Sequence, residues 1–175
     1  IGFTIAEIDE GKTTTVCSIA KCFSDLENHR ILLIDCDFRK KSVAKTLEIE
    51  NKKGIADMTM NDMDRKECIK KVEGFDVLTC GVSPSNSSVL LESKKFRDII
   101  ESLKGDYDYI FIDSPPLGRL NDAAILARYL DGTIIVNASE YIDQQMAKVT
   151  RGKREKVNAN VIGVILNKFK AGDHK

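Results

Sequence analysis

The stretch IGFTIAEIDEGKTTT, Ile1 to Thr15, decides which fold the chain is expected to adopt. Its first five residues, IGFTI, are mostly apolar, β-branched or aromatic, which predicts a strand. Lys12 begins a run, KTTTVCSIAKCF, that is typical of a helix. In a strand–loop–helix of this kind, backbone N–H groups at the helix N-terminus can bind phosphate. Taken alone, the stretch fits equally well a plain strand–turn–helix in which Gly11 only relieves backbone strain.

The phosphate-binding interpretation gives two residues of the loop a definite role. The Lys12 ammonium would neutralise the β- and γ-phosphates of a nucleotide. The Thr13 hydroxyl would bind Mg²⁺, which prefers oxygen ligands. The sequence around Gly-Lys-Thr therefore predicts a polyphosphate site, provided that other strands bring suitable groups to the same place.

Composition is that of an ordinary globular domain. The 175 residues fit one domain over 1–175, and the start at Ile1 suggests a fragment without its natural termini. Lys plus Arg and Asp plus Glu both number 27, so the zero net charge gives no sign of nucleic-acid binding. Five cysteines without metal-binding spacing indicate reduced cytosolic thiols. No apolar run approaches the roughly 18 residues of a membrane span.

Short apolar runs alternate with helical patterns along the chain. The expected strands are 1–5, 31–35, 75–79, 109–113, 132–136 and 161–166, and the expected helices are 12–26, 64–72, 89–103, 122–129 and 141–157. Runs such as ILLID and YIFID do not alternate with polar residues, as expected of parallel strands that are covered on both faces. The pattern predicts an α/β fold, a doubly wound, mostly parallel sheet flanked by helices. Ligands of such sheets bind beyond the carboxyl ends of the strands.

A second group of polar residues follows the run ILLIDCDFRK, residues 31–40. Asp35 and Asp37 come at the carboxyl end of the expected strand, and two carboxylates in this spacing can share a cation. Without a metal they would repel each other, and one pKa would rise. Arg39 could pair with a phosphate or an acid. The alternative is that these are solvated turn residues at the end of a strand.

Two further strands end in polar side chains. DYIFIDSPP ends an apolar run in Asp113, which is suited to hold Mg²⁺ or its water, and Pro115 and Pro116 stiffen the exit. VIGVILNKF ends in Asn167, whose amide could recognise adenine or could be a plain strand-end residue. The Gly-Lys-Thr loop and the acids that end two other strands are expected to meet at one edge of the sheet, which makes a nucleotide site the better interpretation.

These motifs, in this order, resemble the catalytic domain of the bacterial tyrosine kinases of capsule and exopolysaccharide synthesis. That family is related to the ParA/MinD ATPases and has a P-loop fold. DEGKTT resembles its Walker A motif, ILLIDCDFR its Walker A′ motif and IFIDSPP its Walker B motif. The likeness continues in GIADM, in NDAAILARYLDGTIIV and in VIGVILNKF, so it spans almost the whole chain.

The resemblance implies transfer of the γ-phosphoryl group of ATP to tyrosine, with ATP or ADP and Mg²⁺ as the cofactors. It implies catalytic roles for Lys12, Asp35, Asp37 and Asp113, with one of the acids Asp35 and Asp37 as the base for the tyrosine hydroxyl. The nucleotide would be held by Glu10, Gly11, Lys12, Thr13, Thr14, Arg39 and Asn167, and the metal by Thr13, Asp35 and Asp113. Asp122 falls at the family's Asp of the D-A-A segment.

The resemblance also implies partners and a location. The expected partner is a membrane-anchored polysaccharide copolymerase or activator protein, with the full-length chain as its own substrate and a ring homo-oligomer as its assembly. Nucleic acid is not expected. The domain is expected in the cytoplasm, at the inner face of the cell membrane. The family's C-terminal tyrosine cluster does not occur in this sequence, whose four tyrosines are scattered.

The loop departs from the family's usual sequence. Ala6 replaces the opening glycine of G-x-x-x-x-G-K-[ST], and Ile8 and Asp9 stand where the family usually has proline and glycine. A carboxylate at Asp9 near the phosphates costs about 1 kcal/mol or more. The first alternative is therefore a degenerate relative, weakly catalytic or non-catalytic, that senses nucleotide or binds a partner. The second is a ParA/MinD-like ATPase, which is disfavoured because Glu7 stands in place of that family's signature lysine.

Overall fold

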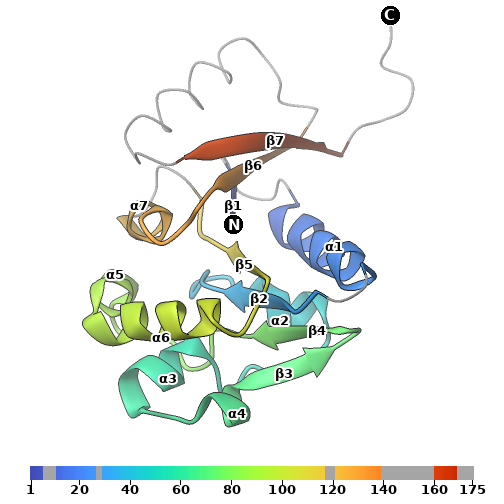
Figure 1. Ribbon diagram of the computed structural model, residues 1–175. Helices are drawn as coiled ribbons and strands as arrows, with labels where there is room; N and C mark the ends of the chain where they lie inside the picture. The colour runs from blue at the N-terminus through green and yellow to red at the C-terminus, as the bar shows by residue number, and fades with distance from the viewer. Residues whose placement is uncertain (6–10, 27–28, 117–120, 139–159, 169–175) are drawn as a thin grey trace, which may run out of the picture.

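The computed structural model describes residues 1–5, 11–26, 29–116, 121–138 and 160–168 (Figure 1). Seven strands of these ranges form one sheet in the order β3-β4-β2-β5-β1-β6-β7. Neighbouring strands are parallel except β3 and β4, which are antiparallel. The strands are β1 (Gly2–Ile5), β2 (Ile31–Asp35), β3 (Ile69–Val72), β4 (Phe75–Leu78), β5 (Tyr109–Asp113), β6 (Thr133–Ala138) and β7 (Val161–Asn167). The prediction of a doubly wound, mostly parallel sheet is confirmed.

Helices cover both faces of the sheet. α1 and α2 lie on one face, and α3 to α7 lie on the other (Figure 1). The helices are α1 (Lys12–Ser24), α2 (Ser42–Thr46), α3 (Ile55–Asn61), α4 (Arg65–Cys68), α5 (Ser87–Glu92), α6 (Lys94–Lys104) and α7 (Asn121–Ala127). Among the helices in the described ranges, none is both long and apolar enough to cross a membrane.

The expected helix 64–72 is wrong in its second half, and β3 was not predicted. α4 begins after Asp64, whose carboxylate accepts a hydrogen bond from the backbone N–H of Lys66 (2.7 Å), and ends after one turn. The chain then forms a hairpin with β4 in which Val72 pairs with Phe75. The two turn residues, Glu73 and Gly74, both have positive φ (49° and 96°), as tight hairpins require. Short-range turn geometry therefore overrides the helical pattern.

The expected helix 89–103 is two helices, and two further helices were not predicted. Ser93 has an extended backbone between α5 and α6, and its hydroxyl accepts from the backbone N–H of Phe96 (3.1 Å), so it caps α6. α2 and α3 are short elements with 5 and 7 residues, too short for a clear periodic pattern. The expected helix 141–157 and the residues 6–10 of the loop lie outside the described residues.

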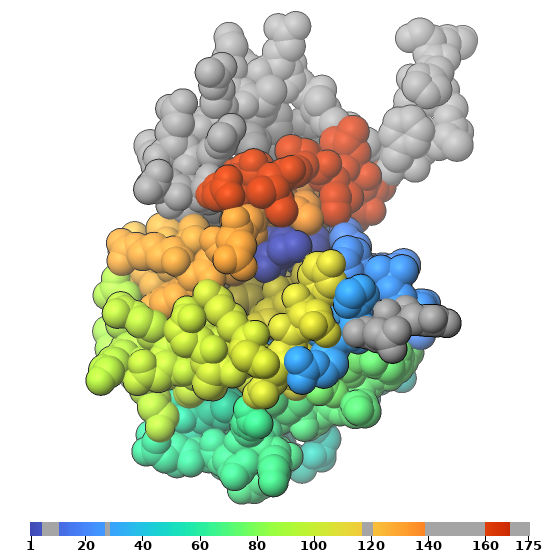
Figure 2. All heavy atoms as spheres, viewed as in Figure 1, coloured from blue at the N-terminus to red at the C-terminus, as the bar shows by residue number. Residues whose placement is uncertain are grey.

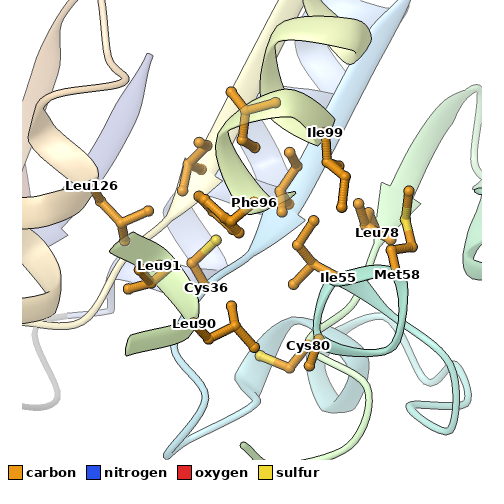
Figure 3. Packing of buried hydrophobic residues seen from close by; sticks show 14 of the residues in the cluster. Cys36, Ile55, Met58, Leu78, Cys80, Leu90, Leu91, Phe96, Ile99 and Leu126 are labelled. Carbon is orange, nitrogen blue, oxygen red and sulfur yellow. The ribbon is translucent and has the colours of Figure 1, made fainter. Parts of the chain in front are cut away.

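Buried side chains form a cluster on each face of the sheet. One cluster packs the helices from α3 through α7 against the sheet. It includes Phe96, Leu90, Cys36 and Cys80 (Figure 3). The other joins α1 to the sheet and includes Phe3, Phe111 and Val16. The two clusters fix the strands from both sides and so hold their carboxyl ends in place.

The β7 edge of the sheet is less covered than its centre. Figure 2 shows β7 on the surface of the molecule, next to α7. Ile162, Val164 and Leu166, on one side of β7, are each more than half exposed, whereas Ile165 on the other side packs against the α1 cluster. At the centre of the sheet, by contrast, every residue of β2 is buried.

Candidate active site

Two acids lie side by side at the carboxyl edge of the sheet. Asp35 ends β2 and Asp113 ends β5, and these two residues are partners in the parallel register of the two strands. Both side chains are fully buried. The expectation that separate strands bring their terminal acids together is confirmed, because adjacent parallel strands end at the same level.

The first residues of α1 contact Asp113 directly. The Lys12 ammonium, only 4% exposed, forms an ion pair with one carboxylate oxygen of Asp113. The Thr13 hydroxyl donates a hydrogen bond of 2.8 Å to the other oxygen. Burial raises the pKa of the Asp113 carboxyl, and the neighbouring Lys12 and Thr13 partly offset this effect. The Walker A and Walker B residues of the sequence are therefore one hydrogen-bonded unit.

Gly11 joins the loop to α1 and approaches the end of β7. Its φ of 81° is left-handed, which a glycine adopts without strain. A Cβ placed on Gly11 would lie 2.1 Å from the amide nitrogen of Asn167, so a larger residue would have to displace that side chain. The structure thus brings Asn167, the last residue of β7, against the start of α1, as the sequence predicts for a residue of the same site.

Asp35 has different partners from Asp113. Its carboxylate accepts hydrogen bonds from the backbone N–H groups of Asp37 (3.0 Å) and Val43 (3.1 Å). Burial raises the pKa of the Asp35 carboxyl to about 7, the charge of Asp113 adds to the rise, and the two N–H donors lower it. Asp35 is therefore a carboxyl group that exchanges its proton near neutral pH.

A cavity of about 240 Å³ opens between α1 and α2. Its wall contains Gly11, Lys12, Thr13, Thr14, Asp37, Lys40, Ser42 and Thr46. Asp37 is the acid that reaches this wall, and its carboxylate accepts from the backbone N–H of Lys40 (3.2 Å). Asp35 and Asp113 do not line the cavity and are fully buried. The two acids of the D-C-D segment therefore have different access to a ligand.

Most of the predicted site residues converge, and a few do not. Arg39 is exposed and does not contribute to the cavity wall, and its contact with phosphate stays a prediction. Glu10 lies outside the described residues. Asp122 is buried at the start of α7, and its carboxylate accepts from the hydroxyls of Ser87 and Ser88 at 2.5 Å each. It links α5 to α7 and is not part of the cavity wall.

Three residues of the cavity wall were missed by the sequence reasoning. Lys40, Ser42 and Thr46 belong to α2 or to the turn before it. The signal that could have revealed them is the proximity of K-S-V-A-K-T to the two acids, since a segment that leaves the carboxyl end of β2 must pass the site. A helix of 5 residues has too few apolar positions to show which side faces the cavity.

The donors at this edge suit a magnesium–nucleotide complex. The carboxylates and the Thr13 hydroxyl offer oxygen ligands, and the buried Lys12 offers a cation. Within the described ranges, no three Asp, Glu, His or Cys side chains are placed to hold a metal by themselves. This is compatible with Mg²⁺, which is bound through one or two carboxylates together with phosphate oxygens and water.

A strand, a Gly-Lys-Thr helix start and an acid that ends a neighbouring strand together define the chain as a P-loop nucleotide-binding domain. The sequence profile of the AAA_31 family, an AAA domain, matches residues 9–159. The tyrosine-protein kinase CpsD of Streptococcus pneumoniae is 31% identical over 172 residues, which are 97% of this chain and 75% of that protein. The tyrosine-protein kinase YwqD of Bacillus subtilis is 29% identical over 94% of this chain and 70% of that protein. The chain belongs to the AAA_31 family and, within it, to the bacterial tyrosine kinases.

Solved structures support the same assignment. The kinase domain of the Escherichia coli tyrosine kinase ETK has a TM-score of 0.90 at 25% identity and covers 99% of this chain and 69% of that chain. The VpsO kinase domain has a TM-score of 0.89 at 31% identity and covers 97% and 84%. The septum site-determining protein MinD of Pyrococcus horikoshii, complexed with Mg-ADP, shares the fold with a TM-score of 0.78 at 20% identity, covering 98% and 71%. The family resemblance inferred from the motifs is confirmed.

Proposed function

We propose that the chain is the catalytic domain of an ATP-dependent protein-tyrosine kinase that regulates capsular or exopolysaccharide synthesis. The observation that carries the proposal is the unit of Lys12, Thr13 and Asp113, with the acids of the D-C-D segment beside it. The names of its relatives, which are tyrosine-protein kinases, support the reaction.

The chain's residues would divide the work between binding and charge neutralisation. Bound MgATP supplies the γ-phosphoryl group. Lys12 would neutralise the phosphates, and Thr13 would help hold the metal with Asp35 and Asp113. The backbone N–H groups of residues 10–14 and the amide of Asn167 would hold the rest of the nucleotide. Such a site lowers the barrier mainly by positioning reactants and by balancing charge.

Asp37 is the acid that we assign to the acceptor side. It reaches the cavity wall, so its carboxylate can accept the proton of a tyrosine hydroxyl that enters between α1 and α2. Asp35 is fully buried, and two backbone N–H groups already occupy its oxygens. Geometry therefore favours Asp37 over Asp35 as the base, although the pKa of Asp35 is raised to about 7.

The described tyrosines are built into the fold, which supports an acceptor elsewhere. The Tyr107 hydroxyl donates to Asp76 (2.7 Å), and the Tyr129 hydroxyl donates to the carbonyl of Leu91 (2.9 Å). Tyr109 lies in β5 and packs edge-on against Phe23. The acceptor would be a tyrosine of a partner protein or of a segment of the full-length chain other than the described residues.

The partner would be a membrane-anchored polysaccharide copolymerase or activator, and its contact would hold the domain at the inner face of the membrane. Assembly into a ring of identical chains would present the acceptor tyrosine of one copy to the site of the next. The solved relative named the chimerical protein CapA2B2 is compatible with such a pairing, since it covers 96% of this chain with a TM-score of 0.90.

Two measurements test the proposal, namely MgATP binding by calorimetry and phosphorylation of a synthetic Glu/Tyr copolymer. We expect Asp37→Asn to reduce turnover by about 10²- to 10⁴-fold while MgATP binding changes little, because a base acts on the transition state. Asp62→Asn is the matched control, since Asp62 is an exposed acid that pairs with Lys95 away from the site.

The same assays separate the alternatives. If the natural chain does not bind MgATP at millimolar concentration but the double variant Ile8→Pro/Asp9→Gly does, the domain is a degenerate relative. ATP hydrolysis stimulated by DNA or lipid vesicles, without tyrosine phosphorylation, would instead indicate a ParA/MinD-like ATPase.

A further inference from the structure

We propose that Lys41 is a positioning residue, which ties the acid loop, residues 35–41, to the β4 exit, residues 79–82, and so holds Asp35 and Asp37 in place. The catalytic part of this inference rests on the proposed function. The structural part, a link between two loops, depends only on the hydrogen bonds of Lys41.

Lys41 makes two contacts that end the acid loop. Its backbone N–H donates to the carbonyl of Asp37 (2.8 Å), which closes the turn that follows the acids. Its ammonium donates to the carbonyl of Gly81 (2.7 Å) in a partly buried position. Lys41 therefore joins the turn that carries Asp37 to the segment that follows β4, the strand next to β2.

The backbone of Lys41 adopts an unusual conformation. Its φ of 48° is left-handed, a conformation that a lysine rarely adopts. Such a conformation persists only where the surroundings fix it, and such residues gather at functional sites. No side chain caps the start of α2, so the usual helix-capping explanation does not apply to Lys41. The contact with Gly81 instead accounts for the left-handed backbone of Lys41.

The β4 exit is a firm anchor for Lys41. The backbone N–H of Gly81 donates to the side chain of Asn51 (2.7 Å), and that of Val82 donates to the buried carboxylate of Asp57 (3.1 Å). A Cβ placed on Gly81 would lie 2.0 Å from Asp57 Oδ2, and its φ is 73°. The backbone of residue 81 is thus held by two side chains and leaves its carbonyl to Lys41.

A second link runs between the same two segments. The thiol of Cys80 donates to the backbone carbonyl of Asp35 (3.3 Å), and Cys36, the next residue, is completely buried. Figure 3 shows the Cys36 and Cys80 side chains within the same apolar cluster. The cysteines hold the base of the acid loop, and Lys41 holds its end. Without the Lys41 ammonium, the end of the acid loop would lose its direct link to the β4 exit, while the backbone bond from residue 41 to Asp37 would remain.

Cys36 provides a reporter of this arrangement that does not depend on activity. Its side chain is completely buried, so a reagent in solution cannot reach the thiol while the loop is closed. A maleimide reagent can modify it only when the acid loop opens. Cys68, which is also buried but belongs to α4, reports in the same sample on opening of the fold away from the acid loop.

The test compares the natural chain with Lys41→Met, Lys41→Arg and the control Lys95→Met, by peptide-resolved thiol modification. Methionine keeps the length and the backbone preference approximately and removes the charged donor. We expect Lys41→Met to raise the modification rate of Cys36 about tenfold with Cys68 unchanged, since a hydrogen bond from a charged group is lost. Lys41→Arg restores the natural rate. Lys95→Met removes a surface pair with Asp62 and leaves Cys36 unchanged.

Kinetics give the second readout. Lys41→Met is expected to lower kcat about tenfold with KM for MgATP within about twofold, because the acids act in the transition state. An unchanged Cys36 rate in Lys41→Met, or a rise shared equally by Cys36 and Cys68, overturns the positioning role. If the natural chain shows no kinase activity at all, the proposed function fails, and the Cys36 result still decides whether Lys41 holds the loop.

Discussion

Asp35 and Asp113 occupy equivalent places in the sheet and yet are held in opposite ways. They are register partners on adjacent parallel strands, and both are fully buried. Asp113 is neutralised by the ammonium of Lys12 and the hydroxyl of Thr13. Among the residues that the structure describes, no cation contacts Asp35, which is held by backbone N–H groups from Asp37 and Val43. The sheet sets where an acid lies, and its neighbours decide whether it carries a charge.

This difference suggests a division of roles at the edge of the sheet. The Asp113 carboxylate, paired with a buried lysine, can attract a metal ion once the lysine turns to a phosphate. A carboxyl whose pKa is about 7 can release or take a proton under physiological conditions. Variants that remove the partners of Asp113 or the ionisable group of Asp35 should therefore have different effects.

The largest effect is expected for Lys12→Met. Removing the ammonium leaves Asp113 as an uncompensated buried charge, so we expect the free energy of unfolding to fall by about 3–5 kcal/mol. Urea denaturation at neutral pH measures this. MgATP binding should be lost as well, since the same ammonium is assigned to the phosphates.

A second variant shows whether the loss comes from the unpaired charge. The double variant Lys12→Met/Asp113→Asn removes both charges and should recover part of the stability that Lys12→Met loses. Lys95→Met, which breaks an exposed pair with Asp62, should stay within measurement error of the natural chain. A double variant no more stable than Lys12→Met would mean that the ion pair is not what holds Asp113.

Much of this contrast is visible in the sequence. Asp35 and Asp113 each end an unbroken apolar run, and such runs are read reliably as buried parallel strands. Adjacent strands end at one edge, so the meeting of the acids follows from the α/β alternation alone. Lys12 and Thr13 were identified because Gly-Lys-Thr after a strand has a specific mechanism.

The rest depends on contacts that no local pattern encodes. That Asp37 reaches the cavity while Asp35 is enclosed depends on a turn and on the short helix α2, which places Val43 against Asp35. The exposed position of Arg39 follows from the same turn. β3 escaped notice because Glu73-Gly74 is a tight hairpin turn without the usual Asn or Asp. In each case a side chain or turn from a distant segment decides the outcome.

The next effect concerns the pH dependence of stability and isolates Asp35. Its pKa rises from 3.8 to about 7 on folding. Between these two pH values, Asp35 is therefore protonated in the folded state and ionised in the unfolded state. Ionisation of Asp35 therefore costs stability as the pH rises through this window. Asp35→Asn does not ionise, so its free energy of unfolding relative to the natural chain should rise by about 2 kcal/mol from pH 5 to pH 8.

Comparing the two pH values removes the constant effect of losing a carboxylate oxygen as hydrogen-bond acceptor. Asp62→Asn serves as the control, because an exposed acid should show no such change between pH 5 and pH 8. A difference between Asp35→Asn and the natural chain that stays flat with pH would show that Asp35 is ionised throughout, like a paired acid, and the contrast with Asp113 would disappear.

The smallest effect is expected for Thr13→Val, which tests how much the hydroxyl contributes to holding Asp113. Valine keeps the shape and removes the hydroxyl that donates to Asp113 at 2.8 Å, so stability should fall by about 1 kcal/mol in urea denaturation. Thr13→Ser, which retains the donor, should lose less. If Thr13→Val costs as much as Lys12→Met, then the hydroxyl rather than the ammonium keeps Asp113 in place, and both acids would be held mainly by neutral donors. A small loss instead leaves Lys12 as the group that separates the two acids, so that movement of a single ammonium from carboxylate to phosphate would change the charge balance of the whole site.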